Sequence, residues 1–395
     1  MRKSKEIETH DNREDKFLTM ENPWAGSFQF VCKVFMAILL LFVGLRILFS
    51  SGAMRGLPPW LADIVFSFLS QVVIMAIVPI IAMHYFLKKK RKNTILSTLS
   101  TMGFKKISVK MVLWAVLLGV LMYLFNIVVA SFFNGILLVF GFRFPSMSAG
   151  SFHGFGGLLI SLLIIAILPS TCEEISHRGM LLNGFASRMG IMRAMLWSSV
   201  LFGFMHLNVV QFFYAAILGY LIALATMGAK NLWVGVILHF MNNGIGTYLS
   251  FAGRYGWIGG DWMNRIFGMF TGAGVILYLA FVVALYMSIM AIIRMLARGN
   301  YKKSKQSHIE KLLAVHPSYG QTKAGSPIPF EQVIAEIDEK IEKMPKWNAL
   351  KFYIDPSTIT KQEKVRLTPG EGLWFWGTIA LGTVITVMTL IWGFL

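Results

Sequence analysis

The sequence from Phe155 to Gly179 reads FGGLLISLLIIAILPSTCEEISHRG. Its first part, up to Leu168, is apolar and predicts a helix that enters a bilayer, where one span takes about 20 residues. Two adjacent carboxylates, Glu173 and Glu174, come shortly after this apolar run. Burying a carboxylate at membrane depth costs roughly a few kcal/mol or more. We therefore expect this pair to serve the function of the protein.

Acidic residues are scarce on both sides of this stretch. Between residues 22 and 296 the chain has four, and only Asp63 and Asp261 lie outside the Glu173–Glu174 pair. The whole chain is 56% hydrophobic and only 14% charged, a composition typical of a membrane protein with several spans. We therefore expect an all-α fold, a polytopic transmembrane helix bundle.

Apolar stretches of spanning length recur along the chain. The stretch 155–185 continues through the charged motif, and the stretches 192–208 and 211–228 are shorter than the others. Counting each of these as a span predicts about nine transmembrane helices, at roughly 20 residues per span. The predicted spans are 30–50, 60–87, 111–139, 155–185, 192–208, 211–228, 231–252, 267–296 and 373–395.

The short loops predict the orientation of the bundle, because loops rich in Lys and Arg stay in the cytoplasm. The segment 88–110 holds eight basic residues and no acid, whereas the loop 51–59 holds only Arg55. We therefore place 88–110 in the cytoplasm, and the alternation of spans gives a cytoplasmic N-terminus. The formal net charge of +18 then reflects topology and anionic headgroups, so no nucleic acid partner is expected.

Polar segments divide the chain into four predicted parts. Residues 1–29 form a polar cytoplasmic N-terminal tail, and residues 30–296 form the transmembrane bundle. Residues 297–372 form a cytoplasmic insert that contains an amphipathic stretch from Phe330 to Met344. Residues 373–395 form a C-terminal transmembrane helix.

Two further pairs of polar or aromatic residues follow on later predicted helices. The first is Phe202 with His206, and the second is His239 with Asn243. A spacing of four places both members of a pair on one face of a helix. At a rise of ~1.5 Å per residue, Glu173, His206 and the second pair reach similar depths near the middle of the membrane. The sequence is compatible with one shared site.

The three motifs read Glu-Glu-x-x-x-Arg, Phe-x-x-x-His and His-x-x-x-Asn, in this order on successive predicted helices. Together they resemble the CPBP family of intramembrane glutamic endopeptidases, also called the Abi or CAAX-protease-like family. This family includes the Ras-converting endopeptidase that trims prenylated CAAX proteins. The resemblance covers about residues 154–250, which we take as the catalytic core within the bundle.

The resemblance implies an intramembrane endopeptidase that hydrolyses a peptide bond with an activated water. Glu173 matches the general base of the family, and a partly desolvated site suits a carboxylate that accepts a proton. His206 matches the histidine that helps to hold the same water. His239 and Asn243 match the pair that donates hydrogen bonds to the oxyanion, where preorganised donors are worth most.

Glu174 and Arg178 have a separate predicted role. Glu174 lies about 100° around the helix from Glu173, so the two carboxylates need not do the same job. Arg178, four residues later, predicts an ion pair that fixes the helix and tunes Glu173. The alternative is a plain buried salt bridge that serves packing and register.

Other polar and aromatic residues have plainer expected roles. Phe202 is expected to pack on the face of His206. Gln71, Asn208 and Asn242 either line a pocket or, as we favour, form hydrogen bonds between helices.

Two rival functions remain open. Glu173, His206 and His239 would supply three ligands for a catalytic zinc ion with water in the open position, although no His-Glu-x-x-His helix supports this. A non-catalytic immunity factor or transporter would use the same polar residues to bind a peptide or an ion. Cys32 and Cys172 lie in or beside spans and indicate neither a disulfide framework nor a thiolate metal site. We rank the glutamate mechanism first, and it needs no metal and no cofactor.

A site inside the membrane and open to the cytoplasm suits a membrane-anchored protein or peptide as the substrate. Nothing in the sequence selects a prenylated one. The predicted partners are this substrate and the lipid bilayer. The predicted location is a cell membrane with several passes, and we favour a prokaryotic plasma membrane over the endoplasmic reticulum.

Overall fold

The computed structural model describes most of the chain, and the residues outside the description include the first 21 of the predicted tail 1–29. The described residues are 22–395 except 53, 55, 90–93, 144–150, 323–324, 360–365 and 395. They form helices and no β-strand, which agrees with the predicted all-α fold.

The first half of the chain builds the helices up to the charged motif. Three stretches within it, labelled η, are π-helical and interrupt longer helices. The elements are α2 (Phe28–Ser50), α3 (Pro59–Ser67), η1 (Phe68–Ile77), α4 (Val78–Lys88), α5 (Ile95–Met102), α6 (Val109–Val139), α7 (Gly154–Ser161), η2 (Leu162–Ile167), α8 (Leu168–Glu174), η3 (Ile175–Leu182) and α9 (Asn183–Met189).

The second half contains the rest of the bundle, the insert and the last helix. The elements are α10 (Ile191–Phe204), α11 (Val209–Ala229), α12 (Leu232–Tyr255), α13 (Trp262–Lys303), α14 (Lys305–Val315), a 3-10 turn (Pro317–Gly320), α15 (Phe330–Lys343), α16 (Lys346–Ile354), a second 3-10 turn (Pro356–Ile359) and α17 (Pro369–Phe394).

Seven helices of the described chain are long and apolar enough to cross a membrane, so a polytopic helix bundle is confirmed. They are Phe28–Ser50, Pro59–Lys88, Val109–Val139, Gly154–Met189, Val209–Ala229, Ile276–Lys303 and Pro369–Gly393. As predicted, Gly154–Met189 continues through the charged motif. Two predicted spans are not among the seven: α10 is apolar but has only 14 residues, and α12 carries His239 and the asparagines. The count of nine spans stays a prediction.

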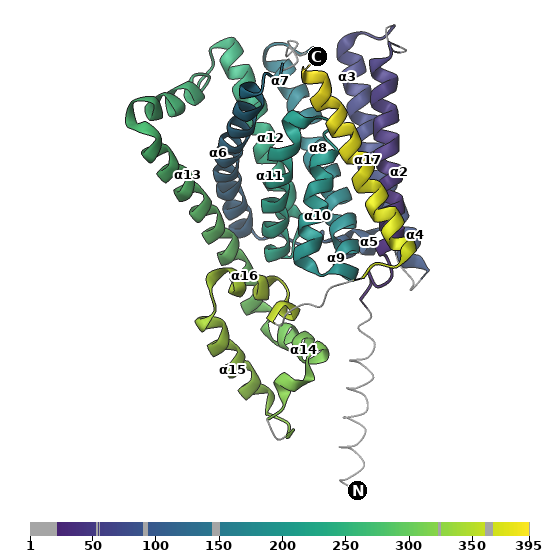
Figure 1. Cartoon of the computed structure of the whole chain (residues 1–395), viewed down its shortest axis with the longest axis vertical. Coiled ribbons are helices and arrows are strands. Elements are labelled where there is room, and N and C mark those ends of the chain that lie inside the picture. Colours follow the sequence, from purple (N-terminus) through teal and green to yellow (C-terminus); the bar gives the residue numbers. More distant parts are fainter. Residues whose placement is uncertain are drawn as a thin grey trace.

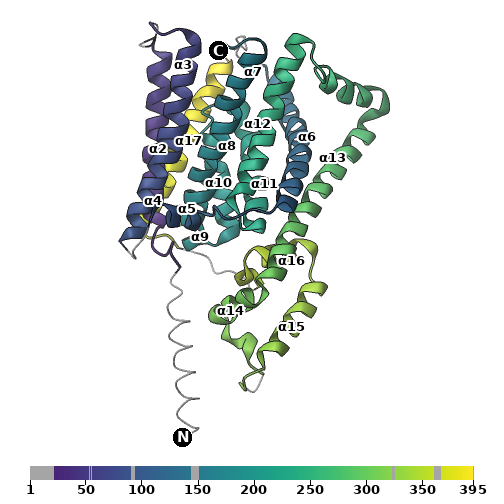
Figure 2. The same cartoon turned by 180° about the vertical axis from the view of Figure 1, so that it is seen from behind.

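The helices lie side by side, with α8, α10, α11 and α12 in the middle of the bundle (Figures 1 and 2). Helices α2, α3 and α17 flank one side, and α6 and α13 flank the other (Figure 1). Helices α14, α15 and α16 lie beyond one end of the bundle, the end at which α5 and α9 are found (Figure 2). The basic segment 88–110 includes α5, so the insert and this segment share one end.

Two apolar clusters hold the bundle together. One joins α2, α4, η3, α10 and α17, and the other joins α6, α11, α12 and α13 with the insert. In the second cluster, Leu221 of α11 and Ile293 of α13 belong to the same core as Ile309 of α14 and Leu350 of α16. The insert therefore packs onto the bundle and shares its core.

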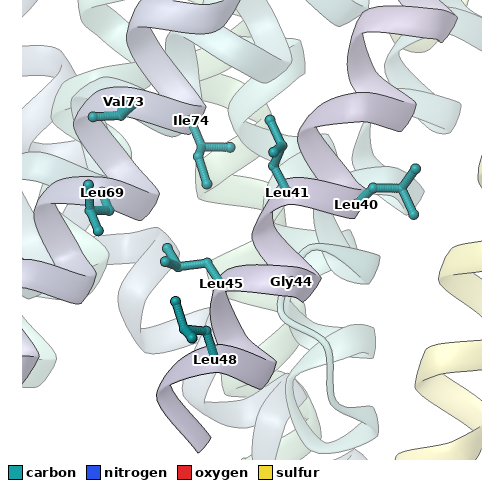
Figure 3. Close-up of a pocket in the computed structure, with 8 residues that line it drawn as sticks. All are labelled: Leu40, Leu41, Gly44, Leu45, Leu48, Leu69, Val73 and Ile74. Carbon is teal, nitrogen blue, oxygen red and sulfur yellow. The ribbon is translucent and has the colours of Figure 1, made fainter. Parts of the chain in front are cut away.

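An apolar groove lies between α2 and η1 (Figure 3). It encloses about 460 Å³. Side chains of Leu69 and Val73, on η1, line it together with Leu40, Leu41, Gly44, Leu45, Leu48 and Ile74. This face of η1 is apolar, whereas Gln71, between Leu69 and Val73 in the sequence, points elsewhere.

Candidate active site

Glu174 and Arg178 form the innermost part of the site. Both are buried, with 0% and 1% of their side chains exposed. Arg178 Nη1 donates to Glu174 Oε1 at 2.8 Å, and Arg178 Nη2 donates to the carbonyl oxygen of Gly219 at 2.8 Å. The ion pair expected from the spacing of four residues is present. The second guanidinium contact also ties this helix to α11.

Two glycines make room for this ion pair. A Cβ added to Gly235 on α12 would lie 2.6 Å from Thr226 Oγ1 and 2.8 Å from Glu174 Oε2. A Cβ added to Gly219 would lie 3.2 Å from Arg178 Nη2. The buried carboxylate thus has its space because residue 235 has no side chain. Neither glycine was predictable as part of the site, since a glycine in an apolar helix indicates only close helix packing.

His239 connects the ion pair to the second carboxylate. Its Nδ1 lies 3.1 Å from Glu174 Oε1, and its Nε2 lies 3.9 Å from Glu173 Oε2. An ionised carboxylate only accepts hydrogen bonds, so Nδ1 carries the proton of that contact and Nε2 faces Glu173. The spacing of the motif predicts the contact of Glu174 with Arg178, but it does not predict the contact of Glu174 with His239.

Glu173 lies in different surroundings from Glu174. Its side chain is 15% exposed, and one oxygen, Oε1, accepts a hydrogen bond of 3.0 Å from Gln71 Nε2. The other oxygen, Oε2, faces His239 across a gap longer than a hydrogen bond. Gln71 forms a hydrogen bond between two helices, as predicted. Its partner is Glu173, the carboxylate predicted to be the general base.

His206 lies in the turn that connects α10 and α11. The predicted helix 192–208 ends at Phe204, because Leu207 takes a left-handed conformation with φ of 51° and Asn208 caps α11. The ring atom Nδ1 lies 2.9 Å from the carbonyl oxygen of Phe202, to which it donates. This leaves Nε2 with its lone pair in the neutral ring. His206 also interacts electrostatically with Glu173 and His239.

Asn243 has partners other than the rest of the predicted site. Its Oδ1 accepts from Asn242 Nδ2 at 3.0 Å, and its Nδ2 donates to the carbonyl oxygen of Ile165 at 3.1 Å. Asn242 Oδ1 in turn accepts from Asn126 Nδ2 at 3.0 Å. The carbonyl of Ile165 is available because Pro169, four residues later, has no N–H to donate to it.

This relay sets the orientation of the Asn243 amide. Because its oxygen is held by Asn242, its NH₂ group points away from Asn242 and toward η2. One N–H bonds to Ile165, and an amide NH₂ has a second N–H to donate. The relay begins at Asn126 on α6, a helix that the motifs do not include.

Phe202 is in contact with four charged or titratable side chains. Its ring centroid lies 5.0 Å from that of His177, 5.1 Å from that of His206 and 5.5 Å from that of His239. The guanidinium carbon of Arg178 lies 4.7 Å from the same centroid. Phe202 does pack against His206, as expected, and its ring also lies against His177 and His239.

His177 is fully buried next to this ring. Its Nδ1 lies 2.9 Å from the carbonyl oxygen of Glu173, while its Nε2 has no hydrogen-bond partner among the described residues. The aromatic rings of Phe35 and Phe202 lie against it at 5.3 and 5.0 Å. Its contacts are those of a packed side chain.

The structure therefore brings Glu173, Glu174, Arg178 and His239 into one connected group, and the ring of Phe202 contacts both His239 of this group and His206. Asn243 is held from the other side by η2 and α6. Within the described part of the chain, no group of three or more His, Cys, Asp and Glu side chains is arranged to hold a metal ion.

Ionisable side chains buried within an apolar helix bundle mark a functional site. Residues 155–245 match the family of Rce1-like type II CAAX prenyl endopeptidases. This match confirms the resemblance seen in the three motifs, and it supports a CAAX-type intramembrane protease acting on a protein substrate in a lipid bilayer. No curated protein and no solved structure matches the chain. The six predicted site residues lie inside the matched segment, whereas Gln71 and Asn126 lie outside it.

Proposed function

We propose that the protein is an intramembrane endopeptidase in which Glu173 activates a water molecule. The observation that carries the proposal is the gap of 3.9 Å between Glu173 Oε2 and His239 Nε2. Two polar atoms at this separation are too far apart to bond directly, and the oxygen of one water molecule can lie within hydrogen-bonding distance of both. A water held there donates a proton to Glu173 Oε2 as its oxygen attacks the scissile carbonyl.

His206 supports the same water from a second direction. Its Nδ1 is occupied by the carbonyl of Phe202, so the lone pair on Nε2 accepts the other hydrogen of the water. After attack, Glu173 gives the proton to the leaving amine, which completes the hydrolysis with no net change at the carboxylate.

The oxyanion is stabilised by His239 and Asn243. His239 donates from Nε2 in its doubly protonated form, whose charge is offset by Glu174 at 3.1 Å from Nδ1. Arg178 pairs with Glu174 and holds it in place. Asn243 donates its second N–H, since its first is bound to Ile165. Donors fixed before the reaction are worth most where charge develops.

The proposed substrate is a membrane-anchored protein or peptide, cut close to the membrane. Glu173 and Glu174 lie on Gly154–Met189, a helix long and apolar enough to cross the bilayer, so a soluble substrate would have to enter the membrane to reach them. We propose a prokaryotic plasma membrane as the location, and the seven apolar helices of the described chain support a protein with several passes.

Cleavage of a pooled library of membrane-anchored peptides by detergent-purified protein tests the mechanism. Wild type is compared with Glu173→Gln, each with and without a strong chelator. We expect cleavage by wild type in both conditions, and a fall of at least 100-fold for Glu173→Gln with the fold retained. A folded and fully active Glu173→Gln protein would sink the mechanism. Loss of wild-type cleavage with chelator, restored by zinc, would favour the metalloprotease instead.

A further inference from the structure

Gln71 reaches the proposed base from a helix outside the matched segment. It lies on η1, the π-helical stretch Phe68–Ile77, and its Nε2 donates to Glu173 Oε1 at 3.0 Å. Residues 71 and 173 are 102 positions apart in the chain. π-helical turns inside α-helices occur frequently at functional sites, and this one contains Ser70 and Gln71 in an otherwise apolar stretch.

The backbone around Gln71 is fixed against the helix of the charged motif. Ser67 Oγ donates to the carbonyl oxygen of Ile164 at 3.0 Å, which joins the start of η1 to η2. Ile164 and Ile165 are neighbours, and Ile165 accepts from Asn243. The same short stretch of η2 therefore fixes both the helix that carries Gln71 and the amide of Asn243.

Burial of the polar side chain of Gln71 destabilises the folded protein unless its polar atoms are hydrogen-bonded. Gln71 is 8% exposed, and its Oε1 has no hydrogen-bond partner among the described residues. A buried acceptor without a partner destabilises the folded protein. An apolar side chain would avoid that cost and would match Leu69 and Val73, which line the groove on the other face of η1 (Figure 3).

We propose that Gln71 is the residue that positions the catalytic carboxylate of Glu173. Its N–H holds Oε1, so Oε2 is the oxygen left to face His239 and to take the proton. The orientation of the Gln71 amide follows from the same contact, because its oxygen would repel a carboxylate, which only accepts. This inference rests on the proposed function of Glu173 and adds a residue that the three motifs do not contain.

The test compares Gln71→Met, which keeps the length of the side chain and removes its donor, with Val73→Ala on the opposite face of η1. On the best peptide from the library, we expect kcat of Gln71→Met to fall 10- to 100-fold, since misplacing a reacting group by about 1 Å costs on the order of 100-fold. KM should stay within twofold, and Val73→Ala should match wild type in both constants. An unchanged kcat for folded Gln71→Met overturns the inference.

A second measurement needs no substrate. Apparent Tm values in detergent are compared for wild type, Gln71→Met, Glu173→Leu and the double variant. If the two side chains hold one another, the two shifts are not additive, and the double variant is less destabilised than their sum. Additive shifts mean that the contact is absent and overturn the inference.

The two measurements separate the possible failures. Non-additive Tm shifts with normal kcat in Gln71→Met reduce Gln71 to a packing residue, while loss of cleavage in Glu173→Gln still upholds the proposed function. A fully active Glu173→Gln protein removes the proposed function and this inference with it. Non-additive Tm shifts, together with a fall in kcat of Gln71→Met at constant KM, support both the proposed function of Glu173 and the positioning role of Gln71.

Discussion

Glu173 and Glu174 are neighbours in the chain, and their carboxylates have different partners. Glu174 is fully buried between Arg178 and His239, whereas Glu173 keeps 15% of its side chain exposed. The helix rotation of about 100° between consecutive residues was enough to predict that the two differ. The link from Glu174 to His239 was not predictable, because it depends on how closely α12 approaches, and that distance is set by Gly235.

Gly235→Ala should therefore damage the site through Glu174. The added methyl group would lie 2.8 Å from Glu174 Oε2 and 2.6 Å from Thr226 Oγ1, so α12 or the carboxylate must move. We expect at least a 10-fold loss of kcat/KM in the peptide assay and a lower apparent Tm.

Gly246→Ala is the matched control on the same helix. Its Cβ would make an ordinary contact of 3.6 Å with Tyr123. The higher helix propensity of Ala, worth roughly 1 kcal/mol over Gly, should leave it as stable as wild type or more so. Equal behaviour of the two variants would contradict the role given to Gly235.

At the scale of elements, the irregular stretches hold the site together. The π-helical stretch η2 and Pro169 leave the carbonyl of Ile165 for Asn243, and the end of α10 at Phe204 puts His206 in a turn. The spacing of His239 and Asn243 correctly predicts one helix, α12. It does not predict the partners of Asn243, since a missing N–H at Pro169 matters only once α12 lies beside η2.

The relay from α6 predicts an effect of Asn126 on catalysis. Replacing it with Leu removes the donor that orients Asn242, so the Asn243 amide is free to rotate and its N–H is no longer fixed. We expect kcat to fall roughly 3- to 10-fold with KM nearly unchanged. This loss is smaller than the roughly 100- to 1000-fold fall in kcat that follows when an oxyanion donor itself is removed.

Asn134→Leu gives the comparison for this prediction. Asn134 lies on the same helix, and its Oδ1 is buried without a partner in the described structure. Removing an unpaired acceptor should leave both activity and stability at least equal to wild type. If Asn126→Leu behaves in the same way, the relay has no catalytic role.

At the scale of the whole molecule, the insert is a second packed unit attached to the bundle. The amphipathic stretch predicted at 330–344 is the helix α15, and it buries Val333, Ile337 and Ile341. Periodicity was sufficient for that prediction. The docking of the insert onto the bundle was not predictable from the sequence, because it joins residues far apart in the chain, such as Lys230 and His308, which are 78 positions apart.

This contact has an unusual composition. Lys230, at the end of α11, places Nζ 2.8 Å from His308 Nε2, and His308 Nδ1 lies 3.0 Å from the carbonyl oxygen of Ser304. Burial, together with the charges of Lys311 and Lys105, lowers the pKa of Lys230 to about 8. Burial and the charge of Lys230 lower the pKa of His308 below 6.5. The docked insert therefore favours a neutral His308 that accepts from Lys230.

Docking should weaken in acid because of this histidine. When the insert is released, His308 regains its ordinary pKa near 6.5 and binds a proton that the docked form excludes. The released form binds more protons below that pH, so the stability of docking rises with pH across this window and falls as the solution is acidified. Lys230 adds the same trend only above pH 8, between its lowered pKa and 10.5. Burial and the charge of Asp338 raise the pKa of the nearby Tyr301 above its ordinary value, so Tyr301 stays protonated from pH 5.5 to 7.5.

Limited proteolysis of the detergent-solubilised protein measures this effect. We expect cleavage within the insert to be faster at pH 5.5 than at pH 7.5, with the protease rate corrected on an unfolded substrate. In His308→Gln the side-chain amide accepts a hydrogen bond from Lys230 and does not titrate, so the difference between the two pH values should disappear. An equal pH dependence in wild type and His308→Gln would assign the effect to other groups. If the protein itself still hydrolyses its peptide substrate at both pH values, release of the insert leaves the site on α8, α10 and α12 intact.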